Sequence, residues 1–180
     1  ADSLAVNGPT QAYLADHLLF RHWTDYAAGK CSHIIIYNID KHTYTDLTPG
    51  NFASPVFMLG GGIGFNFSPD SKELCYASNH SNHPEASTNA DLFLVSVNGG
   101  QSINITKSNA AWDGSPVYSP DGRYIAYRKQ RVPGHESDRF RLALYNRQTG
   151  TSEIITDEFD NWVNDFKWTA DSKSLYFSGD

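Results

Sequence analysis

The sequence repeats one short pattern three times, and this repeat limits the fold more than any other feature. The three copies read FNFSPDSKELCYAS (65–78), PVYSPDGRYIAYRK (116–129) and FKWTADSKSLYFSG (166–179). Successive copies are offset by 51 and then 50 residues. A repeat of this length is typical of supersecondary units that stack on one another, because one such unit cannot bury its apolar faces alone.

Each copy of the pattern predicts a β-hairpin. In two copies a proline sets the backbone for the first turn position, and the Asp with the Ser or Gly after it hydrogen-bonds to turn amides or accepts a positive φ. The residues after the turn alternate, as in Leu74 and Tyr76 against Cys75 and Ala77. A period of two with aromatic and β-branched residues indicates strands.

Two further strands complete the repeating unit. DLFLVSV (91–97) and RLALYNR (141–147) predict the third strand, and SINIT (102–106) and SEIIT (152–156) predict the fourth. Gly-containing turns join them, and no helical period is sustained. The predicted fold is therefore all-β: a partial β-propeller of about three to four blades, each a four-stranded antiparallel sheet.

The same strand pattern gives the expected boundaries. SHIIIYNIDKHTYTDLT (32–48) aligns with the third and fourth strands, and the last copy of the hairpin has no outer strands after it. We therefore expect the first and last blades to be incomplete, as in one fragment of a larger propeller. The expected parts are a lead-in with the outer two strands of a first blade (1–50), two complete blades (51–106 and 107–156) and the inner two strands of a last blade (157–180).

Composition narrows the choice of partners. The formal net charge of −6 argues against a nucleic acid or an anionic membrane surface. No uninterrupted apolar run approaches the roughly 18 residues of a membrane-spanning helix, so no membrane partner is predicted. The two cysteines, Cys31 and Cys75, are expected to be free thiols, with Cys75 in the core.

Two motifs are only weak evidence for a metal site and for a phosphate-binding loop. His80 and His83, with Glu85 nearby, have a spacing that could hold a metal, but a zinc site takes three or four ligands on rigid elements. The GGGIG stretch (60–64) lacks the spacing and the strand-to-helix context of a phosphate loop. We therefore predict neither a metal nor a cofactor.

Several stretches together resemble a known family. LLFRHWTDY (18–26), GKCSHIIIYNI (29–39), the three hairpins and GHESDR (134–139) are similar to the propeller of serine exopeptidases of the prolyl oligopeptidase clan. The closest resemblance is to the dipeptidyl peptidase and acylaminoacyl-peptidase branch, and the Ser-Pro-Asp-Gly turn also resembles TolB-like propellers. The resemblance implies about seven or eight blades, followed by an α/β-hydrolase domain with a Ser-Asp-His triad.

The resemblance also implies a function. No Gly-x-Ser-x-Gly occurs in the chain, so we predict no catalytic residues and no activity for the chain alone. The implied role is a noncatalytic, substrate-gating segment of a serine dipeptidyl or acylaminoacyl peptidase that removes short units from peptide N-termini. Its partners would be a peptide substrate and a C-terminal hydrolase domain, with a homo-oligomer left open. The family inference favours the periplasm or cell exterior. The alternative is a TolB-like protein-binding propeller without enzymatic activity.

A charged insertion holds most of the candidate substrate-binding residues. In QRVPGHESDRFR (130–141), Glu136 would accept the substrate ammonium group, Arg139 would receive a peptide carbonyl or brace Glu136, and Asp138 lies between them. Arg21 and Trp23 are the other candidates. The paired glutamates that well-known dipeptidyl peptidases of the clan carry on a helical insertion are absent, so a different anchor would be needed. The alternatives are a solvated ion-pair network for the insertion and blade packing for Arg21 and Trp23.

Overall fold

The computed structural model describes residues 9, 18, 21–22, 25–27, 29–56 and 63–179. The chain divides into two compact units, residues 1–30 and 31–180. In the first unit, β1 (Arg21–His22) pairs antiparallel with β2 (Asp25–Tyr26). All other strands among the described residues belong to the second unit.

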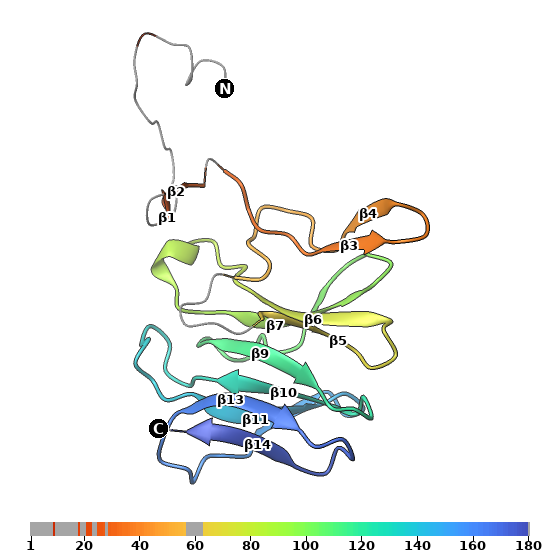
Figure 1. The fold of residues 1–180 in the computed structure, drawn as a ribbon. Helices are drawn as coiled ribbons and strands as arrows, with labels where there is room; N and C mark the ends of the chain where they lie inside the picture. The colour runs from red at the N-terminus through yellow and green to blue at the C-terminus, as the bar shows by residue number, and fades with distance from the viewer. Residues whose placement is uncertain are drawn as a thin grey trace. The chain divides into compact units, whose positions relative to one another are not determined.

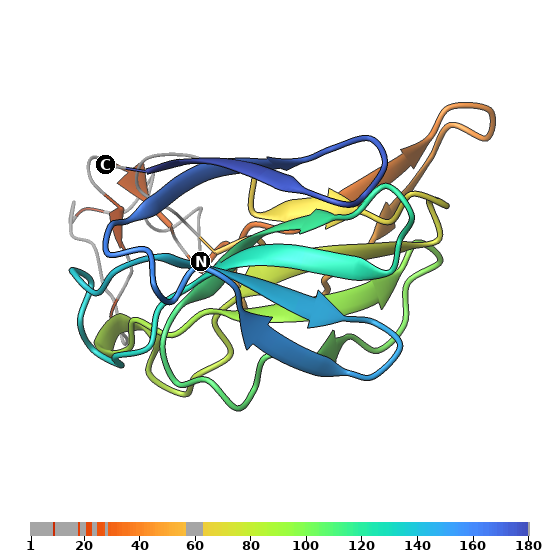
Figure 2. The ribbon, with the colours of Figure 1, turned by 90° about the horizontal axis from the view of Figure 1, so that it is seen from below.

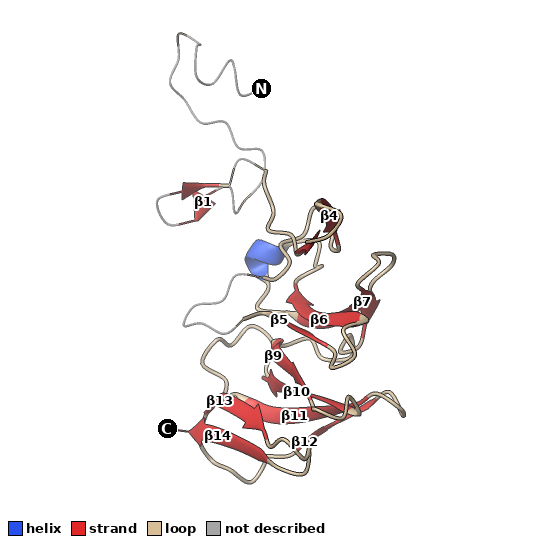
Figure 3. Cartoon of the chain, turned by 45° about the vertical axis from the view of Figure 1, so that its right-hand side comes forward, coloured by secondary structure: helices blue, strands red, loops and turns tan. Residues whose placement is uncertain are grey.

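The second unit consists of four antiparallel sheets in chain order (Figures 1 and 3). Blade 1 has two strands, β3 (Ile35–Asn38) and β4 (Thr43–Asp46). Blade 2 has four, β5 (Phe65–Phe67), β6 (Glu73–Ser78), β7 (Asp91–Ser96) and β8 (Ile103–Asn104). Blade 3 has four, β9 (Asp113–Tyr118), β10 (Tyr124–Lys129), β11 (Arg141–Asn146) and β12 (Thr151–Ile154). Blade 4 has two, β13 (Val163–Trp168) and β14 (Leu175–Gly179).

The prediction of an all-β partial propeller with four-stranded antiparallel blades is confirmed. The one helix among the described residues is a single 3-10 turn, η1 (Pro84–Ala86). None of the described helical residues therefore form a segment long and apolar enough to cross a membrane.

Apolar clusters lie between successive blades, so the middle blades are buried on both faces. Consecutive residues of β6 face opposite neighbours: Leu74 clusters with residues of blade 1, and Cys75 clusters with residues of blade 3. The predicted alternation and the buried position of Cys75 are thus confirmed. The three clusters are Ile34, Leu47, Leu74, Tyr76, Phe93 and Val95; Cys75, Ala77, Leu92, Tyr118, Ile125, Tyr127 and Ala143; and Ala126, Leu142, Val163 and Phe166. Figure 2 views these sheets from the side of β14.

The Ser/Thr and Asp of the repeated pattern stabilise the turn of each hairpin. In blade 3 the Ser119 hydroxyl lies 2.7 Å from the Asp121 carboxylate and accepts the amide N–H of Tyr124 at 3.0 Å. This hydroxyl and the Arg123 amide lower the pKa of Asp121 to about 2. The same contacts recur in the other two copies: Ser68 with Asp70 and Glu73, and Thr169 with Asp171 and Ser174. The aspartates are turn formers, as predicted.

Polar contacts also join the inner strands of neighbouring blades. The Tyr118 amide donates to Asn66 Oδ1 at 3.0 Å, which links blade 3 to blade 2. Trp168 Nε1 donates to the Val117 carbonyl at 3.1 Å, which links blade 4 to blade 3. These bonds fix the orientation of one blade relative to the next.

A buried carboxylate lies where blades 2 and 3 meet. Asp113 is fully buried, and its amide donates to the Ala90 carbonyl at 2.8 Å. Burial raises the pKa of Asp113 to about 7, although Lys129 Nζ lies 3.4 Å away and Asn109 donates to the carboxylate at 3.0 Å. The ionised form of Asp113 is therefore less favourable in the folded chain than in the unfolded chain, and this difference in free energy opposes folding at neutral pH.

The hairpin contact gives a first prediction. Replacing Ser119 by alanine removes a buried hydroxyl that serves two turn groups, so the Ser119→Ala chain should lose about 1–3 kcal/mol of unfolding free energy. Urea unfolding followed by tryptophan fluorescence measures this loss. The control, Ser137→Ala, alters an exposed hydroxyl in the 130–140 loop and should stay within about 0.5 kcal/mol of the unmodified chain. Equal stability of the two variants would contradict the role assigned to Ser119.

The buried carboxylate gives a second prediction, on pH. Between the unfolded pKa of about 3.9 and the folded value of about 7, the folded chain keeps a proton that the unfolded chain releases. The stability of the unmodified chain relative to Asp113→Asn is therefore greatest below about pH 4 and falls as pH rises to about 7. Each pKa unit corresponds to about 1.4 kcal/mol. Parallel unfolding curves at pH 4, 5.5, 7 and 8 measure the difference, and a constant difference would rule out this assignment.

Candidate functional site

Long loops of successive blades meet at one end of the sheets, opposite the hairpin turns (Figure 1). These are the β6–β7 loop (79–90), the β10–β11 loop (130–140) and the β12–β13 loop (155–162). The Gly134 amide donates to Thr88 Oγ1 at 2.9 Å, and Arg131 pairs with Asp157 at 2.9 Å. The three loops, named here the loop surface, are thus directly linked.

Asp157 is the centre of an ion-pair network on the loop surface. Its carboxylate lies 2.9 Å from Arg131 Nη1, 3.5 Å from Arg141 Nε and 3.8 Å from Arg139 Nη2. Arg139 also donates to the carbonyls of Asp157, at 2.9 Å, and Phe159. These contacts attach the 130–140 loop to the 155–162 loop.

Asp138 shapes the turn of the 130–140 loop. Its carboxylate accepts the amide N–H groups of Arg131, at 2.5 Å, and Val132, at 3.0 Å, and it pairs with Arg141 at 3.3 Å. Against the effect of burial, these amides and the Arg141 guanidinium lower the pKa of Asp138. Asp138 and Arg139 therefore make the contacts expected of the ion-pair-network alternative.

Glu136 differs from its neighbours in the loop. Its side chain is exposed, and within the described part of the chain its carboxylate makes neither a hydrogen bond nor an ion pair. Its backbone carbonyl accepts Gln130 Nε2 at 3.1 Å, which holds the loop at this point. The Arg139 guanidinium contacts the 155–162 loop instead of bracing Glu136. The contacts that stabilise this loop therefore do not involve the carboxylate of Glu136.

The side chains of the other two predicted site residues are not described. Trp23 is not described, and for Arg21 only the backbone, in β1, is described. Substrate binding by Glu136, Asp138, Arg139, Arg21 and Trp23 stays a prediction.

A cavity of about 240 Å³ lies beside the inner strands of blades 2, 3 and 4. Phe65 of β5, Ser115 of β9 and Phe166 of β13 contribute to its walls, together with Arg128 from the end of β10 and Asp165. Ser115 has a positive φ of 53° and lies where the pairing of β9 with β10 shifts register. Such bulges redirect side chains.

Arg128 rests on aromatic rings at this cavity. Its guanidinium carbon lies 4.6 Å from the ring centroid of Phe140 and 5.5 Å from that of Trp112. The two rings meet edge to face at 5.0 Å, and Phe140 meets Trp162 in the same way at 5.0 Å. The Trp112 ring covers Gly114 so closely that a Cβ there would lie 2.3 Å from it, so only glycine fits.

The sequence reasoning missed Arg128. A signal existed, because the 51-residue offset aligns Arg128 with Ala77, which is fully buried and belongs to the cluster shared with blade 3. A charged residue at a strand position that faces the neighbouring blade indicates either a buried ion pair or a binding site.

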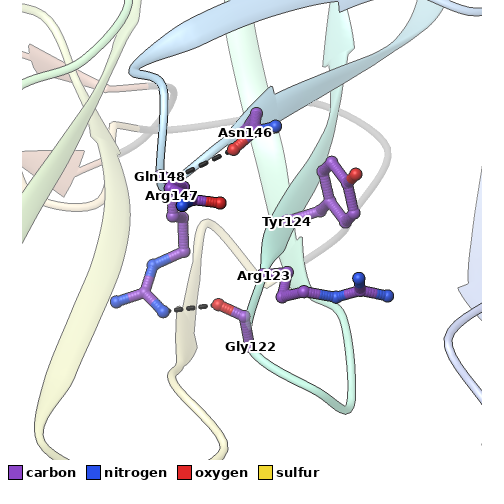
Figure 4. Close-up of a pocket in the computed structure, with 6 residues that line it drawn as sticks. All are labelled: Gly122, Arg123, Tyr124, Asn146, Arg147 and Gln148. Carbon is purple, nitrogen blue, oxygen red and sulfur yellow. Dashed lines mark hydrogen bonds between the residues drawn. The ribbon is translucent and has the colours of Figure 1, made fainter.

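A larger cavity, of about 380 Å³, lies at the opposite end, between the hairpin turns of blade 3 (Figure 4). Its two arginines are already paired: Arg147 with Glu73 at 2.6 Å and Arg123 with Asp121 at 2.6 Å. Arg147 also donates to the Gly122 carbonyl at 2.5 Å. These ion pairs connect the turns, and they leave few N–H donors of the two arginines for a ligand.

The histidines of the 79–90 loop have other contacts. His80 is stacked between Phe52, at 4.1 Å, and Phe93, at 4.2 Å, and burial lowers its pKa. His83 contacts Glu85 at 3.2 Å. Over the described residues, no group of three or more His, Cys, Asp or Glu side chains is placed to hold a metal ion.

Known proteins are similar to this chain in sequence and in fold. The chain is 30% identical over 166 residues to dipeptidyl-peptidase 5 of Porphyromonas gingivalis, an alignment that covers 89% of the chain and 24% of that protein. It is 27% identical over 198 residues to dipeptidyl-peptidase 5 of Aspergillus fumigatus, covering 97% of the chain and 27% of that protein. The chain therefore spans about a quarter of the length of these relatives. No family model matches the chain.

A solved structure with a similar fold is TolB from Acinetobacter baumannii. It is 18% identical and covers 81% of the chain and 31% of TolB, with a TM-score of 0.55. At this identity the likeness concerns the fold alone. The resemblance to the propeller of dipeptidyl peptidases, with TolB-like repeats, is confirmed by these findings together.

The ion-pair network gives a third prediction. In Asp157→Asn, three arginines lose their shared carboxylate, so amide hydrogen exchange in the 130–140 loop should speed up by about fivefold or less, as expected for partly exposed pairs. Raising the salt concentration should reduce the difference in exchange rate between Asp157→Asn and the unmodified chain, because dissolved ions screen such ion pairs. The matched control is Glu158→Gln, a neighbouring exposed carboxylate with no ion pair in the described contacts. Exchange that responds equally to both variants would contradict the network.

Proposed function

We propose that this chain, a propeller segment related to the dipeptidyl peptidases, forms the substrate-gating part of a serine dipeptidyl or acylaminoacyl peptidase. The chemistry would take place in an α/β-hydrolase domain outside these 180 residues. The chain would contribute a wall that admits short peptides and a group that holds their free amino end. The proposed reaction removes short units from peptide N-termini.

The observation that carries this proposal is the loop surface with its free carboxylate. The three loops are linked by the Gly134–Thr88 hydrogen bond and the Arg131–Asp157 ion pair, so the surface can resist deformation by a bulky ligand. Glu136 extends from it without an internal partner among the described contacts. A linked, charged surface suits the exclusion of large substrates better than the tight burial of a small one.

Glu136 is suited to the amino end of a peptide for an electrostatic reason. A carboxylate and an ammonium group form a charge-assisted hydrogen bond, which is stronger than a neutral one. The neighbouring acid, Asp138, has its acceptor positions filled by two amides and Arg141. Of these two loop acids, Glu136 is therefore the better anchor.

Sequencing the gene beyond the codon for Asp180 tests the function at the level of the whole protein. The proposal expects an α/β-hydrolase region with a Gly-x-Ser-x-Gly segment a few hundred residues downstream. A stop codon before any such region would reject the peptidase role and favour a TolB-like protein-binding propeller.

Kinetics of the full-length protein give a fourth prediction. Glu136→Gln should lower kcat/KM for substrates with a free amino end by roughly tenfold or more, because a lost charge-assisted bond costs about 1.5–3 kcal/mol. Substrates with a blocked amino end should be unaffected. Glu153→Gln, on the outer strand β12, is the control and should leave kcat/KM unchanged. If Glu136→Gln behaves like this control on both substrates, Glu136 is not the anchor.

A further inference from the structure

Arg128 has far more hydrogen-bonding capacity than the structure uses. A guanidinium carries five N–H donors. Within the described contacts, the side chain of Arg128 makes one hydrogen bond, a long one of 3.4 Å from Nη2 to Ser115 Oγ. Its Nε is buried without a partner, and no described carboxylate forms an ion pair with it. Arg128 lines the cavity with most of its N–H donors unused, and a charged group with so few partners gains free energy from an acceptor that enters the cavity.

The aromatic rings hold the guanidinium in place for such an acceptor. The guanidinium carbon lies 4.6 Å from the ring centroid of Phe140 and 5.5 Å from that of Trp112, and these two rings contact each other edge to face at 5.0 Å. Such a cation–π contact needs none of the N–H donors, so these donors remain for hydrogen bonds. Little side-chain freedom is then lost when a ligand binds.

The cavity beside Arg128 has the size and lining for a small organic group. Its volume is about 240 Å³, and Phe65, Pro116 and Phe166 provide apolar walls. Asp165 lines the same cavity and places a negative charge near Arg128. This charge disfavours a dianion such as phosphate more strongly than a singly charged carboxylate.

We propose that this cavity binds the carboxylate of a short peptide, with Arg128 as the charged partner. The planar guanidinium matches a carboxylate with two parallel N–H···O bonds, and the apolar walls receive the neighbouring side chain. Glu136 is not among the residues that line this cavity. The choice of a peptide as the ligand rests on the proposed function, whereas the carboxylate chemistry rests on Arg128 and its surroundings.

Binding to the 180-residue chain tests the inference directly. The probes are N-acetyl-dialanine with a free carboxylate and the same compound as its C-terminal amide, titrated by isothermal calorimetry and by tryptophan fluorescence. The acid should bind saturably, and the amide should bind at least about tenfold more weakly, because it loses the charge-assisted pair. Equal binding of acid and amide, or no binding of either at millimolar concentration, would overturn the proposal.

Variants locate the site. Arg128→Gln should abolish the preference for the acid, and Asp165→Asn should tighten binding of the acid by about two- to tenfold, because it removes a repelling charge. Arg123→Gln, at the opposite end of blade 3, should change nothing. If Arg128→Gln fails to fold, judged by near-ultraviolet circular dichroism, then Asp165→Asn decides: unchanged affinity there rejects the site.

The result of this binding test can be distinguished from the result of the test of the proposed function. Binding is measured on this chain, so it does not depend on a hydrolase domain. A gene without a downstream Gly-x-Ser-x-Gly region would reject the peptidase role and leave a positive binding result standing. Inorganic phosphate, titrated in parallel, should compete only weakly with the acid, and displacement at equal concentration would show a general anion site and overturn the assignment to a carboxylate.

Discussion

Burial on both faces of the middle sheets is the constraint on which the described fold depends. Strand β6 has blade 1 on one side and blade 3 on the other, so each of its residues must suit one neighbour or the other. Small side chains meet large ones across the interface, as with Ala77 in the cluster of Tyr127. A shift of one residue in strand pairing would exchange the two faces and disrupt both interfaces at once. The Ser/Thr–Asp turns prevent this shift, because they fix where each inner hairpin begins.

Much of this architecture was predictable from local chemistry. The turn residues and the period of two lie within a few positions of one another, so the sequence reveals both hairpins and faces without any knowledge of distant partners. The candidate site was harder to predict. Asp157 and its arginines are brought together only when neighbouring loops fold, and the Arg147–Glu73 pair joins residues 74 positions apart.

Two charged residues between the blades, Asp113 and Arg128, were missed for the same reason. Asp113 is recognisable as a buried acid only once blade 2 covers it, and the lack of strong partners around Arg128 is known only from the structure, where its side chain makes a single long hydrogen bond. Alternation predicts that a position faces a neighbour, but it does not say whether that neighbour offers a partner. An unusual residue type at such a position is nevertheless a useful signal, as the alignment of Arg128 with Ala77 shows.

The hydrogen bonds between inner strands have a geometric consequence. Asn66 of blade 2 accepts a backbone N–H of blade 3, and Trp168 of blade 4 donates to a backbone carbonyl of blade 3. Such bonds tolerate little change in distance or direction, so each sets the rotation from one sheet to the next. In any ring of sheets the rotations must add up to a full circle, and therefore the step angle determines how many sheets the ring can contain. Side chains such as Asn66 and Trp168 would in this way help to determine the number of blades.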